Sequence, residues 1–149
     1  MAIDFPTGTT SGQQYTYNNT IWEWNGSAWI VAGSNLTLPR DEPVSNPTIS
    51  GNALTLDLSA AQVFGVTLNS PISTFAFSNT PTTANRSIGC TLILTADGTA
   101  RGITWGAPVK WSGGVAPTMT STNGKKDILT FMTVNGGTEW LGFIAGQNF

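Results

Sequence analysis

The sequence predicts an all-β protein: a jelly-roll-like β-sandwich of about eight strands, preceded by a small three-stranded aromatic meander at the N-terminus. Short runs of β-branched and aromatic residues follow one another at roughly 8–12-residue spacing, separated by Gly, Pro and Asn turns. No window of useful length shows the 3.6-residue apolar repeat of an amphipathic helix. The strongest runs, Ile88–Ala96 and Asp127–Val134, are apolar on both faces, which is typical of strands with a neighbour packed on each side.

The clearest single element is a hairpin over Asp127–Phe149. Two apolar runs are joined there by Asn135-Gly136-Gly137, and these residues tolerate the positive φ that a tight reversal between twisted strands requires. Side chains of the first run alternate between two largely apolar faces, Ile128, Thr130, Met132 and Val134 on one and Leu129, Phe131 and Thr133 on the other. We expect this hairpin to be the centre of the sandwich.

The chain divides into an N-terminal module (residues 1–33), a proline-rich linker (34–51) and a β-sandwich domain (52–149). The linker holds Pro39, Pro43 and Pro47, and their spacing predicts an extended strap because proline disfavours both helix and sheet. Besides the hairpin, the predicted strands of the sandwich domain are Leu54–Leu58, Gln62–Leu68, Ile72–Phe77, Ile88–Ala96, Arg101–Trp105 and Val109–Trp111.

The N-terminal module is dense in aromatic residues. A meander of about 20 residues is too small to be stable alone, so we expect it to dock on another subunit or protein as an attachment arm. The candidate contact residues are Tyr15, Tyr17, Trp22, Trp24 and Trp29. These rings could stack on sugars, as in a carbohydrate-binding module, or they could fill the interface between the meander and its neighbour. The second interpretation is favoured, because so small a unit needs its aromatic pairs to stay folded.

Charged residues are scarce, at 9% of the chain with a net charge of −2, against about a quarter of an ordinary soluble domain. The polar surface must come from Thr, Ser, Asn and Gly, which is typical of extended β assemblies and of extracellular or virion proteins. The cations are scattered, with no cluster beyond Lys125-Lys126, and this argues against nucleic-acid binding.

No catalytic, metal or cofactor site is predicted. The chain has no histidine and one cysteine, so it lacks the commonest general base and zinc ligand and cannot form a thiolate cage. Asp57 and Asp127 could in principle form a glycosidase pair, but each is better explained as a turn or strand-edge residue. Cys90 lies in the apolar run Ile88–Leu94 and is expected to be a buried, unreactive thiol. We therefore expect that the protein is not an enzyme.

The opening residues Met1–Pro6 lack the basic and apolar regions of a secretory signal. No apolar run approaches the roughly 18 residues of a membrane span. We therefore expect synthesis in the cytoplasm without a signal peptide, and no insertion into a membrane.

Two sets of residues carry a family resemblance. The first set is Ile3-Asp4-Phe5-Pro6, Gly12-Gln13, Tyr15-Thr16-Tyr17, Trp22-Glu23-Trp24-Asn25-Gly26 and Trp29. The second set is Leu54–Ser59, Leu92–Arg101, Ile103–Trp105, Val109–Trp111, Asp127–Phe131 and Gly142–Phe149. The first set resembles the N-terminal segment of tailed-bacteriophage structural proteins, notably tail-fibre-type proteins of marine and cyanobacterial phages. The second set is similar to a module of phage and prophage tail proteins.

This resemblance implies a virion structural protein, commonly trimeric and without catalytic residues. The leading hypothesis is a tail-fibre or tail-appendage subunit that attaches by its N-terminal arm and displays a β domain for host adsorption. The alternatives are a capsid cement (decoration) protein that stabilises the phage head, and a carbohydrate-binding adsorption module. The implied partners are further copies of the chain, other phage structural proteins of the baseplate, tail or capsid, and a host surface glycan.

The apolar pattern itself favours self-association. One sandwich has one interior, yet Ile88–Ala96 and Asp127–Val134 are apolar on both faces, and no helix is predicted to cover the second face. Part of that face is therefore expected to pack against another chain. The choice of three copies rather than two comes from the phage resemblance alone. A thick monomeric sandwich whose Thr-rich faces need no partner is the alternative.

Overall fold

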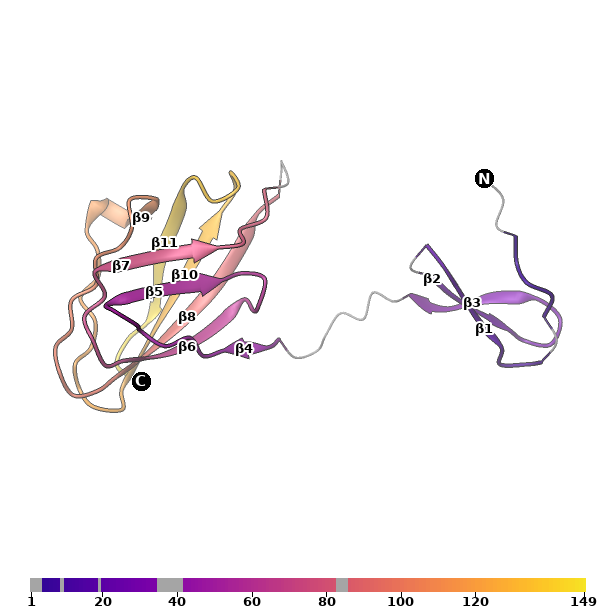
Figure 1. Ribbon diagram of the computed structural model, residues 1–149, viewed down its shortest axis with the longest axis horizontal. Helices are drawn as coiled ribbons and strands as arrows, with labels where there is room; N and C mark the ends of the chain where they lie inside the picture. The colour runs from indigo at the N-terminus through magenta and orange to yellow at the C-terminus, as the bar shows by residue number, and fades with distance from the viewer. Residues whose placement is uncertain (1–3, 9, 19, 35–41, 83–85) are drawn as a thin grey trace. The chain divides into compact units, whose positions relative to one another are not determined.

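The computed structural model describes residues 4–8, 10–18, 20–34, 42–82 and 86–149, and it forms two compact units, Met1–Arg40 and Asp41–Phe149. Its regular structure is almost entirely β, with a three-stranded antiparallel sheet in the first unit and two packed sheets in the second (Figure 1). The predicted all-β class, the sandwich and the N-terminal meander are therefore confirmed.

The smaller unit is the meander β1 (Gln14–Tyr17), β2 (Thr20–Trp24) and β3 (Trp29–Ser34), paired in that order. Asn25 holds the second turn, because its side-chain oxygen accepts hydrogen bonds from the backbone N–H groups of Ser27 and Ala28, both at 2.9 Å. Such Asx turns let a short polar side chain take the place of a backbone partner.

The larger unit consists of a six-stranded sheet and a two-stranded sheet. The six-stranded sheet has the order β4 (Val44–Ser45), β6 (Val63–Leu68), β8 (Ile88–Ala96), β10 (Lys126–Thr133), β11 (Trp140–Gly146) and β9 (Val109–Trp111). The two-stranded sheet pairs β5 (Ala53–Asp57) with β7 (Thr74–Ser78), and Figure 1 shows these two strands lying across the larger sheet. In the described residues the only helix is a single 3-10 turn, Ser112–Gly114.

The core lies between the two sheets. Leu54 and Leu56 of the small sheet, Phe64 of β6, Leu92 of β8 and Phe131 of β10 are all buried in it. Along each of these strands the buried residues alternate with more exposed ones, as the two-residue period of a strand requires. The core thus draws on one face of each sheet.

Successive strands in the first part of the larger unit belong to opposite sheets. From β4 to β8 the chain alternates between the sheets, so β4, β6 and β8 fall in one and β5 and β7 in the other. Strands that follow one another within a sheet are therefore parallel in this part. Among the described strands of this unit, the antiparallel pairs are β8 with β10 and β10 with β11. The layers are those of a sandwich, but this order differs from the antiparallel connections of a jelly roll.

Several strands coincide with the predicted runs. Ile88–Ala96 and Val109–Trp111 begin and end as predicted, and the C-terminal hairpin forms with Gly136 and Gly137 at φ values of 68° and 85°. The predicted strand Arg101–Trp105 is reduced to an isolated bridge between Ile72 and Ile103. Cys90 is buried as expected, and burial raises the pKa of its thiol to about 12.

The linker is shorter than the predicted range 34–51. Its second half belongs to the sandwich: Val44 and Ser45 pair with β6, Ile49 packs against the core, and Ser50 bridges to Ala53. A proline restricts its own position, and the two strand residues fit between Pro43 and Pro47 at a sheet edge, where proline is tolerated. Residues 35–41, with Pro39 among them, lie outside the described residues.

Candidate interaction surfaces

Four of the five predicted contact residues meet in one aromatic cluster of the smaller unit. The strand register pairs Tyr15 with Trp22 and Trp24 with Trp29, so these side chains share a face of the meander. Ring centroids lie 6.1 Å apart between Tyr15 and Trp29 and 5.8 Å apart between Trp24 and Trp29. Tyr17, at the end of β1, is 38% exposed and is not among the ring contacts of the described residues.

The centre of this cluster is Phe5, which the sequence reasoning did not select. Its ring stacks on Trp29 with centroids 5.6 Å apart and meets Trp22 edge-on at 5.0 Å. The indole N–H of Trp29 donates to the carbonyl oxygen of Pro6 at 3.1 Å. The apolar pair Phe5-Pro6, placed before a Gly-rich loop, was the available signal for a segment that folds back.

Phe5 changes the interpretation of the aromatic residues. The meander was expected to need another protein to cover its rings, but Phe5 and Pro6 supply part of that cover within the unit. Gly8 adds to it, since a side chain there would collide with the indole of Trp24. Rings that already stack on one another and on Phe5 offer less open area for a sugar than a free aromatic platform does.

A second candidate surface is the outer face of the six-stranded sheet. Leu129, Phe131 and Thr133 of β10 point into the core, so Ile128, Thr130 and Met132 belong to the opposite, outer face. Residues paired across strands share a face. The register therefore extends this surface from Ile128 to Ile93, from Met132 to Leu141, and from Thr130 to Phe143.

We call Ile128, Met132, Leu141 and Phe143 the outer patch. Met132, Leu141 and Phe143 are 38%, 37% and 47% exposed, and Ile128 is half-buried. The described part of the larger unit thus leaves these apolar side chains uncovered. In the described strands, pairing places two charged residues on the outer face: Lys110, which is paired with Leu141, and Lys126, which is paired with Thr95. An apolar centre with charge only at its margin is the composition of an interface core.

The carboxylates that could have suggested catalysis hold turns and loops together. Asp127 is 2% exposed and accepts hydrogen bonds from Thr120 N at 2.6 Å, Thr120 Oγ1 at 2.7 Å and Asn148 N at 3.0 Å. Asp57 accepts from Asn79 Nδ2 at 2.8 Å and from both the N–H and the hydroxyl of Ser59. These bonds, led by the one from Asn79, hold the pKa of Asp57 below its usual value.

The described residues contain no group of three or more His, Cys, Asp or Glu side chains placed to hold a metal ion. Among the helices of the described chain, none has the length and apolarity to cross a membrane. No protein-family model, curated protein or solved structure matches the chain. The resemblance to phage tail proteins therefore stays a prediction.

Proposed function

We propose that the chain is a structural subunit of a tailed-bacteriophage virion, a tail-fibre or tail-appendage protein that assembles with copies of itself and has no enzymatic activity. The observation that carries the proposal is the outer patch, an apolar sheet face that the described part of the larger unit leaves uncovered. Exposed apolar patches of this kind usually mark interfaces between proteins. The 9% content of charged residues agrees with a protein whose surface is largely used in assembly.

The occupant of the outer patch in this proposal is a second copy of the same chain, within a closed homotrimer. Closed symmetry buries every copy of a patch and leaves no open edge on which a filament could grow. The number three comes from the resemblance to phage fibre proteins. The aromatic module of the smaller unit then serves as the attachment arm to another virion protein, with Tyr17 as its exposed aromatic residue.

Phe143→Glu is expected to dissociate the trimer. Phe143 is the most exposed member of the outer patch, and a buried, unpaired carboxylate there would weaken association by at least about 2 kcal/mol, or roughly thirtyfold. Light scattering at micromolar concentration should give three times the 15.7 kDa of one chain for the wild type and the mass of one chain for the variant.

Ile30→Glu is the matched control, because Ile30 is similarly exposed, at 45%, and lies in the other unit. It should leave the mass unchanged. A wild-type mass of a single chain would end the trimer proposal, and equal dissociation by both variants would remove the outer patch from it.

The virion assignment is tested separately, by locating the chain on purified particles with cryo-EM and antibody labelling. Labelling of the tail supports a fibre or appendage subunit, whereas labelling of the head surface would replace it with a cement protein. If infected cells contain the chain but purified virions lack it, the structural-subunit proposal fails. Adsorption to host cells by the isolated protein, without virion incorporation, would favour the carbohydrate-binding alternative.

A further inference from the structure

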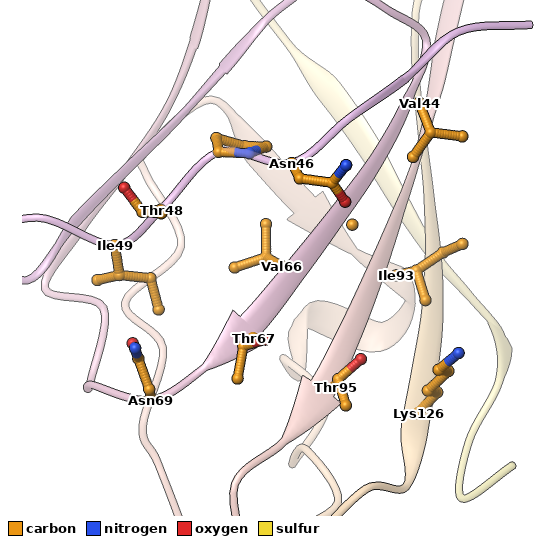
Figure 2. Close-up of a pocket in the computed structure, with 12 residues that line it drawn as sticks. Val44, Asn46, Thr48, Ile49, Val66, Thr67, Asn69, Ile93, Thr95 and Lys126 are labelled. Carbon is orange, nitrogen blue, oxygen red and sulfur yellow. The ribbon is translucent and has the colours of Figure 1, made fainter.

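A hollow of about 510 Å³ lies in the larger unit, where the segment that follows β4 passes over the six-stranded sheet (Figure 2). β4 pairs with β6 only at Val63 and Phe64, after which the chain leaves the sheet. The next residue of β6 is Gly65. A Cβ atom at this position would lie only 2.6 Å from the side-chain oxygen of Asn46. The missing side chain and the diverging segment together create the space.

Six polar side chains surround this hollow: Asn46, Thr48, Thr67, Asn69, Thr95 and Lys126. Figure 2 shows Asn46 and Thr48 on the side of the crossing segment, with Thr95 and Lys126 on the opposite side. No hydrogen bond or ion pair joins any of these six side chains to another described residue. The hollow therefore presents amide, hydroxyl and ammonium groups that are free to bind a ligand.

The remaining lining is aliphatic, from Val44, Pro47, Ile49 and Ile93 among others. Aliphatic surface interspersed with amide and hydroxyl groups suits a sugar ring, which has both C–H faces and hydroxyl edges. Among the described residues, the lining contains one cation, Lys126, and no carboxylate. A charge-assisted hydrogen bond from its ammonium group would select a ligand that carries an acid group.

We propose that this hollow binds an acidic oligosaccharide, a few sugar rings long, with a carboxylate on Lys126 and ring hydroxyls on the amides and threonines. The proposal is independent of the virion assignment, because it depends only on the lining of the hollow. An extended peptide added to the edge of β6 is the competing occupant. It fits less well, since the carbonyl oxygen of Thr67 already accepts a hydrogen bond from Asn69 N at 2.9 Å.

The test is isothermal titration of the full chain with trimers of galacturonic acid and of mannuronic acid. The uncharged matches are galactotriose and mannotriose, which replace each carboxylate with a hydroxymethyl group. Triglutamate supplies the same number of carboxylates without sugar hydroxyls. At least one acidic trisaccharide should bind saturably, about tenfold or more tighter than its neutral match and than triglutamate.

Lys126→Gln should remove the roughly tenfold preference for the acidic sugar, while Lys110→Gln should retain it. Both lysines are exposed strand residues of the same sheet, and Lys110 lies outside the hollow. Thr67→Val, which keeps the side-chain shape, should weaken acidic and neutral sugars alike. Binding of neither acidic trimer, equal binding of triglutamate, or equal loss in the two lysine variants would each overturn the proposal.

Discussion

Replacing Trp140 with alanine is expected to lower the free energy of unfolding of the larger unit by about 3–5 kcal/mol. The side chain is 1% exposed, and its indole stacks on Phe77 with centroids 4.0 Å apart and planes 19° from parallel. Trp140 belongs to the six-stranded sheet and Phe77 to the two-stranded sheet. The substitution would therefore open a cavity at a point where the two layers hold each other.

Urea unfolding followed by circular dichroism measures this effect, in the Phe143→Glu background so that assembly does not contribute. Leu141→Ala is the control, because residue 141 is next in the strand but points to the outer face and is 37% exposed. It should change stability by less than about 1 kcal/mol. If both variants cost the same, the stack does not hold the layers together.

Asp127→Asn is expected to cost about 2–3 kcal/mol at neutral pH. The buried carboxylate accepts hydrogen bonds from Thr120 and Asn148 and a longer one, 3.3 Å, from Gln147. An amide presents an NH₂ group toward some of these donors, so it cannot replace all of the bonds. The loop at residue 120 and the segment 147–149 should both loosen from β10.

The cost of Asp127→Asn is expected to depend on pH. Burial by itself raises the pKa of Asp127, but the hydrogen bonds from Thr120, Asn148 and Gln147 outweigh burial and lower the pKa overall. A lowered pKa means that the stabilisation is fully present above the unfolded-state pKa of about 3.9 and is lost as the pH falls through the folded-state pKa. The difference in stability between wild type and variant should therefore shrink as the pH is lowered below about 4.

Urea unfolding at pH 7 and at pH 3 checks this expectation. Glu139→Gln, an exposed substitution in the turn between β10 and β11, is the control. It should change the free energy of unfolding by less than about 0.5 kcal/mol at either pH. A difference for Asp127→Asn that stays constant with pH would show that the carboxylate charge is not what holds the two segments.

Local pattern was enough to predict most of the strands. Ile88–Ala96 alternates between apolar and smaller residues and is bounded by turn residues, so both of its ends could be placed. The hairpin after Val134 was predicted from Asn135-Gly136-Gly137. The apolar residues that now lie on the outer face, Ile93 of β8 and Ile128 and Met132 of β10, were also visible in the sequence.

Features set by distant residues could not be predicted. The pattern gives a strand its faces but not its neighbours, so the parallel pairing of β5 with β7 and of β6 with β8 was missed. Val44-Ser45 was assigned to the linker because a two-residue strand has no period to detect. The role of Phe5 depends on a chain reversal, and the hollow over Gly65 depends on where Asn46 passes.

The alternation of the chain between the two sheets also bears on how the domain folds. Val44 pairs with Val63 and Val63 with Thr91, so each pairing closes a loop that contains a strand of the opposite layer. The entropy of closing such loops is lost before the contacts that compensate for it have formed. High contact order of this kind characterises slowly folding β proteins, whereas the β10–β11 hairpin needs only one short turn. We therefore expect the edges of strands β4 to β8 to stay open longer during folding than those of the β10–β11 hairpin.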